Sequence, residues 1–235
     1  MTQITTIERA KAQARILRTA LSDIGHDVAH GQALDLLARL EGVRDWNALV
    51  ARLTPMPTLG PIPKGWRRGG DKAERFDMGL DEGAGPEGAP CATIRLRPGA
   101  DPDNAFGTLM QSVDAAPFLG TRVALTAHLR AEDVAGAVTI WLRADGTDRS
   151  YNLAFDNLED RQGETGPLAG TMGWERRRIV LDIPEGTVTL AFGFYLRGSG
   201  QGWCADMELA PAPGAEVTAS QPIPAPEPVN MGLSG

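Results

Sequence analysis

The spacing of hydrophobic residues changes once along this chain, and the change predicts two parts. Near the amino terminus apolar residues recur every three or four positions, which is the period of an amphipathic helix. Further along they alternate with polar residues, which is the period of a strand with one buried face. We therefore expect an α+β chain with segregated parts, a helical module over residues 1–53 and an antiparallel β-sandwich over residues 64–210.

The amino-terminal pattern predicts a small bundle of three helices. Thr5 and Glu8 have the T-x-x-E spacing of a capping box, and Gly25 suits the left-handed position that ends a helix. A second helix should end at Gly42, and Asp45 should cap a third. The residues expected to face the bundle core are Ile7, Ala10, Ala14, Leu17, Leu21 and Ile24, then Ala33, Leu36, Leu37 and Leu40, then Trp46, Leu49, Val50 and Leu53.

The pattern in the longer part of the chain predicts many short strands with turn-rich segments between them. Apolar positions alternate over residues 123–129 and 138–143, and further strands are expected at 91–96, 107–113, 151–155, 177–183, 187–196 and 203–209. No helical pattern separates these runs. We predict an antiparallel two-sheet sandwich of jelly-roll type.

Two proline-rich segments lie outside these patterns. Residues 54–63 should form a linker, because proline removes amide donors and stiffens the chain. Residues 211–235 lack hydrophobic periodicity, so we expect a disordered tail.

Composition and charge narrow the range of partners. The chain is 42% hydrophobic and 23% charged, as a globular protein is. Its pattern shows neither the uninterrupted apolar run of a signal peptide nor a membrane-spanning stretch, so we expect a cytoplasmic protein. The net charge is −7, with +1 over residues 1–53 and −8 over the remainder. This balance argues against nucleic acid as a partner, because affinity for nucleic acid grows with the number of phosphates neutralised.

Cys91 and Cys204 are the two cysteines of the chain. Neither belongs to a metal-type pair at close spacing. In a cytoplasmic protein they are interpreted as free, buried thiols rather than a disulfide.

The run from His30 to Leu49, with Arg44-Asp45-Trp46-Asn47 as its most specific part, resembles a helical module at the amino end of bacterial proteins described as glyoxalase-related. The chain shows nothing like the metal-binding βαβββ unit of a true glyoxalase. The resemblance therefore implies a shared accessory module without glyoxalase activity.

Residues from Gly65 to Glu208 resemble β-sandwiches of the galactose-binding or carbohydrate-binding-module type, which occur appended to bacterial transcriptional regulators and to some hydrolases. The resemblance implies a fold but not a ligand, because this fold serves many roles. The segments that carry it are Gly65-Trp66, residues 107–111, Trp141-Leu142-Arg143, Phe155-Asp156-Asn157, Gly173-Trp174 and residues 200–203.

No motif for catalysis or for a cofactor is visible. There is no G-x-S-x-G, and His26 and His30, although spaced four apart, are bracketed by glycines that indicate a turn rather than a metal-binding helix. Acidic turn residues offer oxygens for Ca²⁺ but lack the D-x-[DN]-x-[DN]-G order, so solvated turn carboxylates are favoured; they are Asp145, Asp148, Asp156 and Asp160. We expect no enzyme, no metal and no cofactor.

The polar face of the sandwich is the candidate binding site. Trp141 and Arg143 project opposite Ile140 and Leu142, so an aromatic surface lies beside a guanidinium, an arrangement suited to a sugar or another polar ligand. The residues expected to join them are Gln111, Asn157, Gln201 and Trp203. The alternative is that Trp141 and Trp203 are packing residues of the sheet.

These patterns predict a non-catalytic binding or regulatory protein whose jelly-roll presents a polar and aromatic face to a small polar ligand such as a carbohydrate. The alternative is a self-associating scaffold without a small-molecule ligand. The apolar stripe of the first helix exceeds what two short partner helices cover, which favours a homo-oligomer formed through the helical module.

Overall fold

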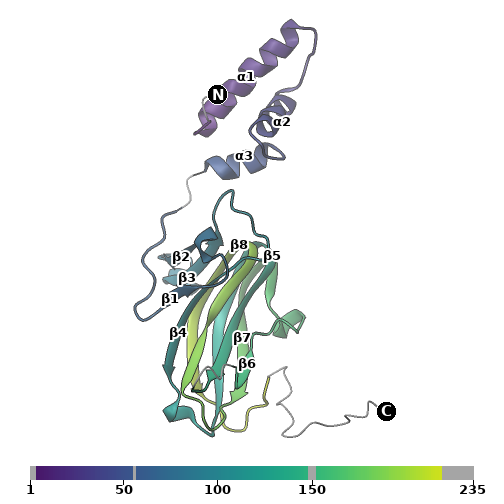
Figure 1. The fold of residues 1–235 in the computed structure, drawn as a ribbon. Coiled ribbons are helices and arrows are strands. Elements are labelled where there is room, and N and C mark those ends of the chain that lie inside the picture. The colour runs from purple at the N-terminus through teal and green to yellow at the C-terminus, as the bar shows by residue number, and fades with distance from the viewer. Residues whose placement is uncertain (1–3, 55–56, 148–151, 219–235) are drawn as a thin grey trace, which may run out of the picture. The chain divides into compact units, whose positions relative to one another are not determined.

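The computed structural model describes residues 4–54, 57–147 and 152–218 (Figure 1). Contacts between Cα atoms divide the chain into Met1–Thr58 and Leu59–Gly235. The first is called the helical unit below and the second the β-unit, and each is described by itself. In the described residues, no helix is both long and apolar enough to cross a membrane.

The helical unit contains the three predicted helices, α1 (Ile7–Asp23), α2 (His30–Leu40) and α3 (Trp46–Leu53). The N-cap of α1 is Thr6, one residue later than predicted, and its side chain accepts a hydrogen bond from the Arg9 amide at 3.2 Å. Asp45 caps α3 as predicted and accepts from the Ala48 amide at 2.9 Å. Each side chain satisfies an amide that the helix start leaves without a partner.

The core of the helical unit differs in part from the predicted stripes. Ile24 follows the end of α1 and is 70% exposed, and Leu40 at the end of α2 is 72% exposed. The buried face of α2 is rotated relative to the prediction because α2 contacts both α1 and α3. The buried cluster comprises Ile4, Ala10, Ala14, Leu34, Leu37, Ala38 and Leu49.

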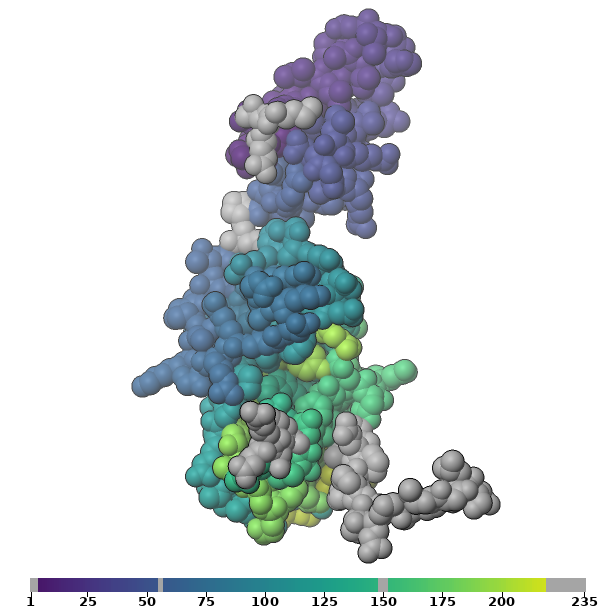
Figure 2. Space-filling view, viewed as in Figure 1, coloured from purple at the N-terminus to yellow at the C-terminus, as the bar shows by residue number. Residues whose placement is uncertain are grey.

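The β-unit is an antiparallel sheet with eight named strands, which confirms the predicted antiparallel β-part. Figure 2 shows the segment that contains β1 to β3, in blue, on the surface of this unit. The strands are β1 (Arg67–Gly69), β2 (Phe76–Asp81), β3 (Cys91–Leu96), β4 (Phe106–Asp114), β5 (Arg122–Asp145), β6 (Ala154–Asp156), β7 (Leu168–Asp182) and β8 (Thr189–Pro211).

Two long strands join what the sequence predicts as four. The predicted runs at 123–129 and 138–143 both belong to β5, and those at 187–196 and 203–209 both belong to β8. β5 and β8 pair along their lengths, with a register shift between Glu132 and Ala135. On one side of the shift they lie between β7 and β3, and on the other between β6 and β4. Backbone hydrogen bonds along both long strands therefore connect the two sheets of the predicted sandwich into one continuous sheet.

Glycines allow the two long strands to pass this register shift. Gly136 and Gly198 are paired just beyond it, next to the Ala135–Ser199 pair, and have φ of 137° and 85°. A Cβ at either position would overlap a backbone carbonyl of the opposite strand, that of Arg197 or Ala135. Only glycine combines the positive φ with such close backbone approach.

The apolar face of the sheet forms one core, as the alternation predicts. Its largest fully buried side chains come from strands on both sides of the register shift. They include Phe76, Met78, Ile94, Leu109, Leu125, Leu129, Ile140, Leu142, Leu168 and Phe194.

The two proline-rich segments are partly built into the β-unit. Gly60 exchanges backbone hydrogen bonds with Leu80 at 2.8 and 3.3 Å, and Ile62 packs against the core, so residues 59–63 of the predicted linker belong with the sheet. β8 continues to Pro211, and Thr218 exchanges hydrogen bonds with Val180 of β7. Residues 211–218 are thus ordered, contrary to the predicted tail, while 55–56 and 219–235 lie outside the described residues.

Candidate functional site

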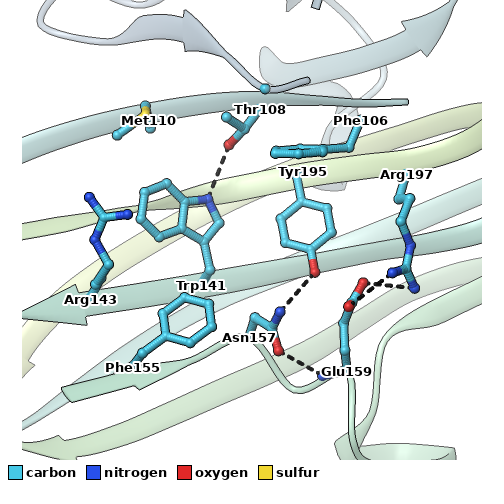
Figure 3. A pocket seen from close by; sticks show the side chains of 11 residues that line it. Phe106, Thr108, Met110, Trp141, Arg143, Phe155, Asn157, Glu159, Tyr195 and Arg197 are labelled. Atoms are coloured by element: carbon cyan, nitrogen blue, oxygen red, sulfur yellow. Dashed lines mark hydrogen bonds and ion pairs between the residues drawn. The ribbon is translucent and has the colours of Figure 1, made fainter. Parts of the chain in front are cut away.

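A cavity of about 450 Å³ lies on the face of the sheet opposite the core (Figure 3). This volume falls in the range of pockets that hold small molecules. Four aromatic side chains form much of its lining. The lining residues are Gly70, Phe106, Thr108, Met110, Trp141, Arg143, Phe155, Asn157, Glu159, Tyr195 and Arg197.

Strand alternation places these side chains together. On β5, Trp141 alternates with core residues Ile140 and Leu142, and on β8 Tyr195 lies between core residues Phe194 and Leu196. The strands β4, β8, β5 and β6 are neighbours in that order here. Side chains of the outer parity on all four strands therefore meet above one patch of sheet.

Trp141 is the central aromatic residue of the cavity. It pairs with Gly193 of β8, which in turn pairs with Met110 of β4, so no side chain on β8 blocks the indole between the two strands. The indole Nε1 donates a hydrogen bond to Thr108 Oγ1 at 3.0 Å (Figure 3). Trp141 is only 7% exposed, so it is a wall of the cavity rather than a projecting platform.

Tyr195 closes the other side of the aromatic lining. Its ring meets Phe106 edge to face at a centroid distance of 5.7 Å, and its hydroxyl accepts a hydrogen bond from Asn157 Nδ2 at 3.2 Å. Burial, and then the nearby Glu159 carboxylate, raise the pKa of Tyr195 well above its ordinary value. The hydroxyl therefore keeps its proton at neutral pH and can serve as a hydrogen-bond donor.

Two ion pairs stand at the cavity. Arg143 Nε lies 2.8 Å from Asp145 Oδ1, and its guanidinium carbon lies 5.9 Å from the centre of the Trp141 ring. Arg197 Nη2 lies 2.9 Å from Glu159 Oε1 (Figure 3). The cavity thus combines an apolar aromatic surface with charged groups that supply both donors and acceptors.

The structure brings three of the six predicted site residues to this cavity, namely Trp141, Arg143 and Asn157. Gln111 does not line it, because it shares the parity of the core residue Leu109 on β4.

Gln201 and Trp203 lie beyond the register shift of β8 and also do not line the cavity. Gln201 Nε2 donates to Thr93 Oγ1 at 3.0 Å. Trp203 is buried, donates to Asp81 Oδ2 at 3.1 Å, and carries Arg130 over its ring at 4.4 Å. Trp203 is therefore a packing residue of the sheet, which was the alternative to a ligand-binding role.

The acidic turn residues make ion pairs with arginines. Asp156 is fully buried and forms two hydrogen bonds with Arg161, at 3.1 and 2.9 Å, while Asp160 lies 3.9 Å from the same side chain. Asp148 lies outside the described residues. Within the described ranges, no group of three or more His, Cys, Asp or Glu is placed to hold a metal ion.

The sequence pattern did not predict the other lining residues, which are Gly70, Phe106, Thr108, Met110, Phe155, Glu159, Tyr195 and Arg197. Alternation about the core residue Leu109 would have found Thr108 and Met110, since both lie on the outer face of β4. Tyr195 carries no such signal, because it lies in an uninterrupted apolar run, Leu190–Leu196, in which both parities are buried.

Comparisons with known proteins divide between the two ends of the chain. Residues 1–73 match the family model described as glyoxalase superfamily protein. The cavity residues from Phe106 to Arg197 lie beyond this match. A curated relative, described as the uncharacterized HTH-type transcriptional regulator YbfP of Bacillus subtilis (strain 168), is 32% identical over 140 residues. The match covers 60% of this chain and 45% of YbfP, which is less than half of that relative's length.

Similar solved structures include carbohydrate-binding modules. TmCBM61 in complex with β-1,4-galactotriose matches with a TM-score of 0.40 and 15% identity, covering 65% of this chain and 92% of that chain. The C-terminal family 22 carbohydrate-binding module of Clostridium thermocellum Xyn10B matches with a TM-score of 0.44 and 12% identity, covering 65% and 89%.

Proposed function

We propose that the β-unit is a non-catalytic binding module that holds a small polar ligand of carbohydrate type in the cavity around Trp141. The observation that carries this proposal is the combination of aromatic walls with hydrogen-bonding groups in a single cavity of about 450 Å³. A sugar ring has an apolar face of C–H groups and a rim of hydroxyls. The first packs on aromatic rings, and the second pairs with amide, guanidinium and carboxylate groups.

The chemistry of the lining favours binding over catalysis. General acid–base or nucleophilic catalysis needs a titratable group held ready to exchange a proton with the substrate. Here each charged lining residue already faces a partner of opposite charge, and the raised pKa of Tyr195 keeps its hydroxyl neutral. The glyoxalase-superfamily match covers residues 1–73 and so does not supply the cavity with a catalytic role.

We also propose a regulatory context for this binding. The description of YbfP as a transcriptional regulator supports it, with the ligand of the β-unit as the signal. The expectation of a cytoplasmic protein stays a prediction.

The test is a binding screen with variants of half-buried lining residues. Titration calorimetry against a panel of neutral and acidic saccharides should find a ligand for the wild-type protein. Phe155→Ala should weaken that ligand about tenfold by removing a stacking surface, and Asn157→Ala should weaken it as well.

Phe118→Ala is the matched control, because Phe118 is also a half-buried phenylalanine of the β-unit but lies outside the cavity. Equal weakening by Phe118→Ala, or no binding of any saccharide at millimolar concentration, would contradict the proposal.

A self-associating scaffold is the second candidate function, and the helical unit supplies the observation that favours it. Ile16, Ile24 and Leu40 are large apolar side chains that are 67%, 70% and 72% exposed. Light scattering after size exclusion should then show a dimer or larger species that Ile16→Glu converts to monomer. A wild-type monomer at high micromolar concentration would reject this candidate.

A further inference from the structure

Each of the two arginines of the cavity forms an ion pair with a nearby carboxylate. Arg143 and Asp145 both lie on β5, two residues apart, with 2.8 Å between Nε and Oδ1. Arg197 at β8 contacts Glu159 through both terminal nitrogens, at 2.9 and 3.1 Å (Figure 3). The charges of these four residues cancel.

In each pair the carboxylate is the more deeply buried partner. The side chains of Asp145 and Glu159 are 10% and 22% exposed, against 31% and 49% for Arg143 and Arg197. A carboxylate in such a setting is stabilised by its arginine, since burying an unpaired charge is strongly unfavourable. The positive charges of the two arginines are therefore neutralised within the protein, which reduces their attraction for an anionic ligand.

This arrangement of ion pairs should give anionic and uncharged ligands different affinities for the cavity. An anionic group near Arg197 would also approach the Glu159 carboxylate, and the repulsion is stronger beside this partly buried carboxylate than in bulk water. A hydroxyl group can accept from a guanidinium and donate to a carboxylate at the same time. Glu159 Oε1 is buried and lies 2.9 Å from Arg197 Nη2, and a carboxylate oxygen can accept a second hydrogen bond, here from a ligand hydroxyl.

We propose that Asp145 and Glu159 determine the specificity of the cavity, and that by neutralising Arg143 and Arg197 they select uncharged polyhydroxylated ligands over their acidic counterparts. This inference rests on the proposed function, because it concerns which saccharides the same cavity takes. Neither carboxylate needs to react with the ligand for this role.

The experiment compares matched probes that differ in charge. Neutral disaccharides, such as cellobiose and galactobiose, are titrated beside their uronic-acid counterparts, cellobiouronate and digalacturonate, at low ionic strength and neutral pH. The full-length wild-type protein should prefer the neutral member of the pair it binds. Glu159→Gln leaves Arg197 unneutralised and should raise the affinity for the acidic member about tenfold or more.

Two further variants isolate the charge effect. Glu132→Gln breaks a similar pair outside the cavity, Arg130–Glu132 at 3.1 Å, and should leave the preference unchanged. The double variant Glu159→Gln/Arg197→Gln restores neutrality and should lose the acquired affinity for the acidic member. Circular dichroism confirms that each variant is folded.

The outcomes separate the two proposals. If the wild-type protein binds neither class, the proposed function fails and this inference fails with it. If it binds saccharides but prefers the acidic members, the inference is overturned while the binding function stands, and this result needs no variant to fold. A folded Glu159→Gln protein with an unchanged preference overturns it in the same way.

Discussion

At Trp141 a single side chain belongs both to the packing of the sheet and to the wall of the cavity. Strand alternation predicts that this side chain points away from the core, and such a tryptophan on an open face would be an exposed platform. The indole instead lies under its neighbours, 7% exposed, with its N–H bonded to Thr108 across β8. Trp141 is therefore not an exposed platform, because an outward-facing residue on a sheet is buried when side chains of adjacent strands close over it.

Trp141→Ala should therefore destabilise the protein by about 3–5 kcal/mol, the cost of truncating a buried tryptophan. Trp141→Phe keeps a ring in place and should lose less, because it removes mainly the indole edge and the bond to Thr108. Urea unfolding of the two variants checks this. A Trp141→Ala protein as stable as the wild type would place the indole outside the packed structure.

The two cysteines are free and buried, as predicted. Burial, and then the charge of Asp81, raise the pKa of Cys91 from 9.0 to about 11, and burial also raises that of Cys204. Because the unfolded chain loses the Cys91 proton at lower pH than the folded protein does, the contribution of this thiol to stability falls as pH rises from about 9 to about 11.

At pH 8 both native thiols should resist alkylation by iodoacetamide and react only after unfolding in urea, since the thiolate is the nucleophile. Mass spectrometry of the labelled peptides distinguishes Cys91 from Cys204. As a control, Cys91→Ser should abolish labelling of the first peptide in urea. Rapid labelling of Cys91 in the native protein would contradict the buried position.

At the scale of elements, the length of β5 and β8 organises the β-unit. Each runs through both halves of the sheet and passes a register shift, so the cavity face and the core face continue along the same two strands. The paired glycines beside this shift allow the two backbones to approach closely, because neither has a Cβ. We expect this point to tolerate added side chains poorly.

Gly198→Ala should cost about 2 kcal/mol or more, because it combines a φ of 85° with overlap of the Ala135 carbonyl. Gly186 has a similar φ of 87° but open space around it, so the loss of stability in Gly186→Ala measures the cost of backbone strain alone. Gly173→Ala has neither and should be close to neutral. If Gly198→Ala unfolds at a temperature no lower than Gly173→Ala does, the close approach of the backbones at Gly198 does not limit stability.

At the scale of the whole molecule, the division between the units falls earlier than the predicted end of the linker. The unit boundary lies at Thr58 and Leu59, because Gly60 bridges to Leu80 and Ile62 packs into the core of the β-unit. A fragment that starts near Gly65 would lose both contacts.

A fragment of residues 59–218 should therefore fold and unfold cooperatively at a higher temperature than one of residues 65–218. Circular dichroism melting curves of the two fragments compare them directly, and limited proteolysis of the full chain should leave the longer fragment. Equal melting temperatures would show that Gly60 and Ile62 contribute nothing to the β-unit. If the longer fragment is insoluble while the full chain is soluble, the two units depend on each other.

The sequence by itself determined the succession of three helices and an antiparallel β-part, the cap at Asp45, and the outward parity of Trp141 and Arg143. These features depend on local spacing and on short-range hydrogen bonds, which a linear pattern records. Only the tertiary structure decided that four predicted strands are two, that Tyr195 and Glu159 meet Trp141, and that Gln201 and Trp203 lie elsewhere. The reason is physical: a cavity is made where strands distant in sequence become neighbours, and alternation within one strand says which face a side chain takes but not which strand lies beside it.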